Sequence, residues 1–386
     1  MTGISEAGTA DTPPTLLKKT RVALMSSVHA PDDIRVFKKE GRSLAEAGFD
    51  VILVATARSE AGDISPLEGI LIRAPRNRFE RMTRSAFGVF LQALKSKASV
   101  CHFHDPELLP YAAILKICGR KVIYDVHEDL PKQVLSKQYL PKPTRKLISA
   151  GVHLLERSAS LFLDRIVAAT PSIAENFPAE KTILVQNYPL LDELFSGESQ
   201  PYLSRRFSVA FVGGITQIRG AREMVTAIGL LDKRWEASLE LAGKIYPPRF
   251  REELGMIPGW ERVMEHGWRS RPEVAALLGR CRAGLVLYHP EPNHIAAQPN
   301  KLFEYMSAGL PIVASNFPLW KEIIEQVGCG LTVNPLDPKA IASALEYLFQ
   351  NPEEAEQMGA RGRRAVEREF NWQREAEKLI SMYEQI

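Results

Sequence analysis

The stretch QPNKLFEYMSAGLPIVAS, residues 298–315, contains the pattern that decides the fold. Pro299 suits the first position of a helix, and a Gly-Leu-Pro stop precedes the β-branched run that follows. At 100° per residue, Leu302, Phe303 and Met306 fall within one arc and can be buried together. A helix that leads directly into an apolar strand is the unit of a parallel sheet with crossover helices.

The same alternation of apolar strands and helical segments runs outward through the whole chain. The predicted strands cover residues 21–27, 50–56, 69–74, 99–104, 121–126, 165–170 and 182–187, and then 207–212, 238–243, 262–267, 283–288, 311–315 and 330–334. The polar segment 196–206, which contains Gly and Pro, interrupts the pattern and predicts a linker. The sequence therefore predicts an α/β protein with two Rossmann-like, doubly wound domains facing a central cleft, preceded by a loose tail over residues 1–18.

Composition narrows the classes of partner. The 386 residues carry 49 Lys and Arg against 46 Asp and Glu, a net charge of +3, which excludes a nucleic acid as the main partner. The excess is local, since residues 51–150 hold 16 basic and 9 acidic residues. The four cysteines are too dispersed for a Cys-x-x-Cys metal site. No secretory signal and no membrane-spanning run is present, so we expect a soluble cytoplasmic protein.

A second pattern predicts a phosphate-binding site. Gly213 and Gly214 end a strand in VAFVGGITQIRG, and Arg219 follows near the start of a helix, where it could bond phosphate oxygens. Lys301 lies in the first turn of the helix in 298–315, where a cation is unfavourable unless an anion binds there. Glu304, which shares a face with Lys301 and Asn300, could accept hydrogen bonds from sugar hydroxyls. The alternatives are a tight Gly-Gly turn and an ordinary surface pair between Lys301 and Glu304.

Polar side chains also follow three predicted strands of the first half: His29, Asp33 and Arg35; His104 and Asp105; and Asp125, His127 and Glu128. If the strands are parallel, the three histidines converge on one crevice. Structural histidines are the alternative. The spacing of Asp125, His127 and Asp129 suggests metal ligands, but a strand turning into a loop does not hold alternate side chains on one face. We therefore expect no metal.

Taken together, these features resemble the retaining GT-B glycosyltransferases of family four. The resemblance covers nearly the whole chain, and its segments appear in the family's order: SSVHAPDDIRVFKKEGRSLAEAGFDV (26–51), HDPELLPYA (104–112), KVIYDVHEDLP (121–131), VQNYP (185–189), VGGITQIRG (212–220) and PNKLFEYMSAGLPIVAS (299–315). It implies transfer of a sugar from a nucleotide-diphosphate sugar to a glycan, glycolipid or other acceptor in polysaccharide or glycoconjugate biosynthesis, without a cofactor.

The resemblance also assigns the domains. It implies that residues 19–196 bind the acceptor through His29, Asp33, Arg35, His104 and Asp105, while residues 207–369 bind the donor. Residues 370–386 would form a helix that packs back on the first domain.

Donor residues follow from the family's motifs, with two departures. Glu304 matches the second Glu of the Glu-x7-Glu pattern and would bond the ribose, but the first Glu is replaced by Ala296, with Asn293 or His294 as substitutes. The family's Gly-Arg is Gly213-Gly214 here. Arg219 and Lys301 would bind the phosphates, and the loop of His266, Gly267 and Trp268 would bind the nucleotide base. The catalytic residues would be Arg219, Glu304 and His127, with His127 near the reaction centre.

Two further hypotheses remain for the function. The departures at Ala296 and Gly214 are also compatible with a nucleotide-sugar-binding accessory protein, and the fold is compatible with a sugar-nucleotide epimerase. Separately, SAFGVFLQALKSK (85–97) and LPKPTRKLISAGVHLL (140–155) mix basic and apolar residues. They predict either helices that lie on an anionic inner membrane face or a solvated basic surface.

Overall fold

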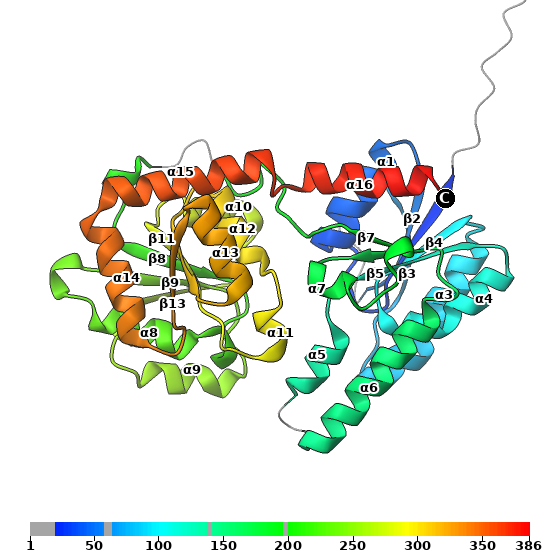
Figure 1. Cartoon of the computed structure of the whole chain (residues 1–386), viewed down its shortest axis with the longest axis horizontal. Helices are drawn as coiled ribbons and strands as arrows, with labels where there is room; N and C mark the ends of the chain where they lie inside the picture. Colours follow the sequence, from blue (N-terminus) through cyan, green and yellow to red (C-terminus); the bar gives the residue numbers. More distant parts are fainter. Residues whose placement is uncertain (1–19, 58–63, 138–139, 196–199) are drawn as a thin grey trace, which may run out of the picture.

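The computed structural model describes residues 20–57, 64–137, 140–195 and 200–386. The predicted tail, residues 1–18, and residues 196–199 of the linker lie outside this part of the chain. Figure 1 shows two lobes side by side, each built on one sheet. All strand pairs are parallel, in the orders β3-β2-β1-β4-β5-β6-β7 and β10-β9-β8-β11-β12-β13. The predicted fold class, with two Rossmann-like domains, is confirmed.

The strands are short and mostly apolar. In the first sheet they are β1 Arg21–Met25, β2 Asp50–Ala57, β3 Glu68–Arg73, β4 Val100–Phe103, β5 Lys121–Val126, β6 Arg165–Ala168 and β7 Thr182–Leu184. In the second sheet they are β8 Ser208–Val212, β9 Ser238–Ala242, β10 Val263–Gly267, β11 Ala283–Val286, β12 Ile312–Ser315 and β13 Gly330–Val333.

Helices cover both faces of each sheet. Those of the first domain are α1 Arg42–Glu46, α2 Arg78–Glu80, α3 Ala86–Lys95, α4 Leu109–Ile117, α5 Leu130–Leu135, α6 Lys142–Ala159 and α7 Pro171–Ala174, with a π-helical segment at Ile34–Gly41. Those of the second half are α8 Ala221–Leu230, α9 Pro248–Gly255, α10 Arg271–Leu278, α11 Pro292–Ile295, α12 Asn300–Ser307, α13 Pro318–Val327, α14 Pro338–Gln350, α15 Pro352–Arg368 and α16 Trp372–Glu384.

The alternation of side chains along β1 explains why its residues are all apolar. Ala23 and Met25 belong to one core cluster, while Val22 and Leu24 belong to another on the opposite face. A strand covered on both faces buries the side chain at every position, so an apolar residue is favoured at each of them.

The strand order reverses between β1 and β4 in the first sheet and between β8 and β11 in the second. These two switch points are where ligands bind in such sheets.

The last helix joins the two lobes. Figure 1 shows α15 on the second lobe and α16, in red, continuing over the first. Trp372 and Tyr383 of α16 are buried in the core cluster of β1 and β2. The Trp372 backbone N–H donates to Pro189 O, and Glu375 accepts from the Gln186 N–H, at 2.9 and 2.8 Å. The two segments in which the chain passes from one domain to the other, residues 186–189 and the start of α16, are therefore hydrogen-bonded to each other.

Helix α6 buries an acidic side chain. Glu156 lies against the first sheet and accepts a hydrogen bond from the Tyr124 hydroxyl at 3.3 Å. Burial is the main cause that raises its pKa to about 7; the nearby Asp129 adds to the rise, while the Tyr124 bond opposes it. The folded protein therefore holds this proton more tightly than the unfolded chain.

This gives a prediction for stability. Between about pH 4.5 and 7 the unfolded chain loses the Glu156 proton first, so the free energy of unfolding should fall as pH rises. Glu156→Gln keeps the acceptor for Tyr124 and should raise the free energy of unfolding by roughly 1–3 kcal/mol at pH 8, with little change at pH 4.5. Urea unfolding at both pH values measures this. The control is Glu46→Gln, at an exposed position of α1; equal effects of the two variants would contradict the prediction.

None of the described helices is long and apolar enough to cross a bilayer.

Candidate functional site

Two cationic side chains fold over the glycine turn that follows β8. A Cβ atom at Gly213, where φ is +115°, would meet Lys301 Nζ at 2.8 Å, and one at Gly214 would meet Arg219 NH1 at 2.8 Å. A side chain at Gly213 would be strained by the positive φ, and a side chain at either position would displace the flexible end of one cation. The paired glycines thus fit a turn in which both cations lie close to the backbone.

Neither cation is neutralised. Lys301 Nζ donates to the Tyr288 hydroxyl at 3.2 Å, and Arg219 NH1 donates to Gly214 O at 3.2 Å. Within the described ranges no carboxylate forms an ion pair with either of them. Both lie about the ring of Tyr288, each 5.7 Å from its centroid. Two partly buried cations beside the N-terminus of α12 form a site for an anion with several oxygens.

Glu304 lies on the same helix as Lys301 but does not pair with it. Its Oε1 accepts from Arg271 NH1 at 2.9 Å, and Arg271 NH2 donates to Glu193 Oε2 at 2.7 Å. The alternative of a surface pair between Lys301 and Glu304 is wrong. Sequence reasoning missed Arg271 and Tyr288, because their contacts with Glu304 and Lys301 form only in the folded chain.

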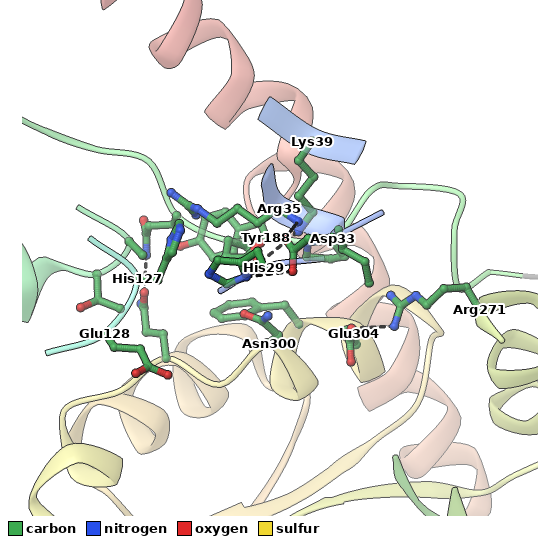
Figure 2. A pocket seen from close by; sticks show the side chains of 18 residues that line it. His29, Asp33, Arg35, Lys39, His127, Glu128, Tyr188, Arg271, Asn300 and Glu304 are labelled. Carbon is green, nitrogen blue, oxygen red and sulfur yellow. Dashed lines mark hydrogen bonds and ion pairs between the residues drawn. The ribbon is translucent and has the colours of Figure 1, made fainter. Parts of the chain in front are cut away.

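A cavity of about 370 Å³ lies between the two domains (Figure 2). The first domain contributes His29, Asp33, Ile34, Arg35, Lys39, His127, Glu128, Ala169 and Thr170, the crossing segment contributes residues 186–189, and the second domain contributes Arg271, Gln298, Asn300, Phe303 and Glu304. The cavity thus joins residues predicted for the acceptor side to residues predicted for the donor side. Lys301 and Arg219 do not line it, but Asn300 and Glu304 of the Lys301 helix do.

The three predicted histidines lie together, as parallel strands imply. The centroid of the His127 ring lies 5.6 Å from that of His29 and 5.1 Å from that of His104. His29 Nδ1 lies 3.1 Å from Asp33 Oδ2. Burial raises the pKa of Asp33, but the hydrogen bond from His29 and two backbone N–H groups outweigh it and hold the pKa at about 2. An ionised Asp33 therefore faces the cavity.

One ring nitrogen of His127 has a hydrogen-bond partner, whereas the other lies near a carboxylate without forming a hydrogen bond. Nε2 lies 3.0 Å from His104 Nδ1, and Nδ1 lies 3.2 Å from Asp125 Oδ1. A substrate could bond Nε2 only by displacing His104, while Nδ1 is buried beside Asp125. In Figure 2 the His127 ring forms part of the cavity wall.

Two predicted acceptor residues have structural partners. Arg35 is buried and pairs with Asp125 and Glu40 at 3.0 and 2.8 Å, so its charge is compensated. Asp105 is also buried, where its Oδ2 accepts from the Ser26 hydroxyl and the Ser27 N–H at 2.8 and 2.6 Å. It does not line the cavity.

The remaining predicted donor residues are spread around the second domain. His266 Nε2 bonds Glu240 Oε2 at 2.6 Å, and the Trp268 side chain is 71% exposed. Gly267 borders a second hollow of about 250 Å³ beside Gly243. Asn293 and His294 are on the short helix α11.

These two residues of α11 already have protein partners. The Asn293 side-chain carbonyl accepts from the Ser136 hydroxyl of the first domain at 2.8 Å. His294 is buried, and its Nδ1 lies 3.1 Å from His289 O. Asn293 thus forms a contact between the domains beside the cavity.

Two family models match this chain, one on each domain. Residues 35–181 match the model described as Glycosyltransferase Family 4, and residues 206–351 match the model described as Glycosyl transferases group 1. The chain belongs to glycosyltransferase family four. The fold of the two domains is GT-B.

Curated relatives of this family four chain match over parts of their length. Residues aligned with spore coat protein SA of Bacillus subtilis strain 168 are 40% identical over 83 residues, 21% of this chain and 22% of that protein. D-inositol 3-phosphate glycosyltransferase of Paenarthrobacter aurescens is 27% identical over 252 residues, 57% of this chain and 58% of that protein. The chain thus spans between about a fifth and three fifths of these relatives.

Solved structures share the GT-B fold over almost the whole chain. Sucrose-phosphate synthase from Thermosynechococcus elongatus superposes with a TM-score of 0.77 at 20% identity, covering 95% of this chain and 99% of that one. Anabaena Alr3699/HepE in complex with UDP and glucose gives a TM-score of 0.72 at 14% identity, covering 95% and 100%.

Proposed function

We propose that this protein is a retaining glycosyltransferase that moves a sugar from a nucleotide-diphosphate sugar to a glycan, glycolipid or related acceptor in polysaccharide or glycoconjugate assembly. The observation that carries the proposal is the pair of cations, Lys301 and Arg219, which lie over the glycine turn after β8 and have no carboxylate partner in the part of the chain that the structure describes. Family membership supports this reading, as do the solved complexes of the similar Anabaena Alr3699/HepE with UDP and with UDP-glucose.

In the proposed complex the diphosphate lies on the N-terminus of α12 between Lys301 and Arg219. Breaking the anomeric bond places negative charge on the leaving diphosphate, and these two groups stabilise it without reorganisation. Glu304 accepts the ribose hydroxyls, and Arg271 holds its carboxylate in place from the opposite side. The base lies toward the loop of His266 and Trp268.

The reacting sugar and the acceptor occupy the cavity between the domains. Asp33 and His29 line its first-domain side, and the ionised Asp33 can accept a hydrogen bond from an acceptor hydroxyl. The His127 ring contacts the transferred sugar as part of the wall, since its Nε2 is engaged by His104 and its Nδ1 is buried beside Asp125. We propose no cofactor for the transfer.

The test is a matrix of donors and acceptors. Wild-type protein is incubated with UDP-, GDP- and dTDP-sugars, with and without glycan and lipid-linked acceptors, and nucleotide release and products are measured. Acceptor-dependent release with retained anomeric configuration supports the proposal. Donor binding without turnover would favour an accessory protein, to which Ala296 at the first Glu position points, and an altered sugar without acceptor would identify an epimerase.

We also propose that the first domain rests on an anionic membrane surface. Helix α6 turns apolar side chains outward, with Leu147 and Leu154 being 75% and 65% exposed. Lys142, Lys146 and Arg157 are exposed beside them, whereas the single acidic residue of this helix, Glu156, is buried. An exposed apolar face with only basic neighbours suits the surface of an anionic leaflet.

Liposome co-sedimentation tests this membrane proposal. Binding should require anionic lipid, at about 1 kcal/mol for each basic residue near the surface. Leu147→Ser with Leu154→Ser should weaken binding at least about tenfold, because each leucine loses burial in lipid. Met256→Ser, at an exposed residue of the second domain, is the control. Equal binding of the wild type to neutral and to anionic vesicles would contradict the proposal, and the exposed face of α6 would then be only a solvated surface.

A further inference from the structure

Four side chains that bind metals in other proteins are buried together behind the cleft. Glu40 belongs to the π-helical segment, His102 to β4, His104 to the turn after β4, and Asp125 to β5. Each is at most 4% exposed. One ligand atom from each lies within 4.8 Å of the others. The proposed transfer reaction uses none of the four.

The atoms that face one another lack hydrogen-bond partners. Within the described residues this holds for His102 Nε2, His104 Nε2 and Glu40 Oε2, whereas Glu40 Oε1 is paired with Arg35 Nε. His104 Nε2 lies 3.6 Å from Glu40 Oε2, and His102 Nε2 lies 3.7 Å from Asp125 Oδ2. Two ligands of a tetrahedral Zn²⁺ with bonds of about 2.0–2.1 Å lie about 3.3–3.5 Å apart. These two pairs are close to that spacing, and since the four ligand atoms lie within 4.8 Å of one another, an ion would draw the cluster together.

The outer nitrogens of both histidines are held in place. His102 Nδ1 lies 2.7 Å from the Tyr383 hydroxyl of α16, and His104 Nδ1 lies 3.0 Å from His127 Nε2. These contacts suit tautomers in which Nδ1 carries the proton and Nε2 presents its lone pair to the centre. Metal-bound histidines are generally oriented in this way by a partner on the second nitrogen.

The charges leave room for a cation. Arg35 Nε lies 2.8 Å from Glu40 Oε1, and its NH2 lies 3.1 and 3.0 Å from the two oxygens of Asp125. One guanidinium thus faces two carboxyl groups that are themselves in hydrogen-bond contact. Arg35 offsets one of the two carboxylate charges, and the remaining negative charge can be offset by a shared proton or by a bound cation. Arg35 will weaken cation binding, but it leaves Glu40 Oε2 open to the centre.

We propose that Glu40, His102, His104 and Asp125 bind one divalent transition-metal ion, with Zn²⁺ as the ion of choice. Two imidazole nitrogens and two carboxylate oxygens suit zinc, whereas Mg²⁺ and Ca²⁺ prefer oxygen ligands throughout. The site is closed by protein on all sides, as structural zinc sites are. The ion orients His127 through His104 and links β4 to α16 through Tyr383.

Metal content of tag-free, full-length protein tests the proposal. After dialysis against Zn²⁺ and desalting, mass spectrometry should find about one ion per chain. Protein dialysed against Co²⁺ should show the strong visible absorption of a four-coordinate site, and Zn²⁺ should displace it. The Co²⁺ spectrum is recorded on the wild type, so it does not depend on a variant that folds.

Variants locate the ion. His102→Gln and His104→Gln should lose the ion and its spectrum, while His153→Gln, on α6 away from the cluster, should keep both. Circular dichroism confirms that each variant is folded. Absence of a tightly bound ion in the wild type would overturn the proposal and leave a shared proton between Glu40 and Asp125. Retention of the ion when both histidines are replaced would overturn it as well.

Discussion

Replacing Arg219 and Lys301 together with methionine is expected to lower kcat for sugar transfer by at least about 1,000-fold. Loss of one preorganised group that stabilises developing negative charge typically costs about 100- to 1,000-fold in kcat. Methionine keeps most of the side-chain length, so the packing against Tyr288 should survive. Steady-state kinetics with the donor identified by the matrix above measure the effect.

The matched control is Arg222→Met. Arg222 lies in the first turn of α8, three residues after Arg219, and pairs with Glu253, so its charge is already compensated and lies outside the glycine turn. Its kcat should stay within about threefold of the wild type, as for surface positions generally. If the kcat of the double variant falls by less than about tenfold, the two cations do not stabilise the leaving diphosphate as proposed.

The second large effect concerns Glu304. Glu304→Ala should weaken donor binding by about 1–3 kcal/mol, or roughly 5- to 150-fold, because a charge-assisted hydrogen bond to the ribose is lost. The donor dissociation constant is measured by calorimetry. A 2′,3′-dideoxy analogue of the same nucleoside diphosphate makes the assignment specific, since the wild type and Glu304→Ala should bind it about equally.

Glu193→Gln is the control for this experiment. Glu193 is the other carboxylate on Arg271, and its replacement perturbs Arg271 without removing the proposed ribose acceptor. If Glu193→Gln weakens the donor as much as Glu304→Ala, or if the dideoxy analogue shows the full loss, Glu304 does not bind the ribose.

The fold was predictable because it rests on local patterns. In 298–315, one helix and one strand could be recognised from apolar spacing and the Gly-Leu-Pro stop, and this unit is α12 followed by β12. The last predicted strand of the first half shows the limit. Residues 182–187 read as one strand, but β7 ends at Leu184 because Gln186 is held by Glu375 of α16.

Parts of the site that depend on distant contacts could not be predicted. Arg271 reaches Glu304 across 33 positions, and Tyr288 meets Lys301 across 13. The expectation that no metal binds was based only on Asp125, His127 and Asp129, which lie along one segment. It did not consider side chains that the fold brings together from distant segments. Glu40 carried no signal in the sequence, because it reaches Asp125 only through the packing of the π-helical segment against β5.

The central claim is that the glycine turn, Arg219 and Lys301 bind the diphosphate of a nucleotide-activated sugar. Calorimetric titration of the wild type and of the Arg219→Met, Lys301→Met variant with UDP, GDP and dTDP tests it most directly. The account predicts that the wild type binds at least one of these nucleotides and that the variant binds it at least about tenfold more weakly. Absence of binding by the wild type, or equal binding by both proteins, would contradict it.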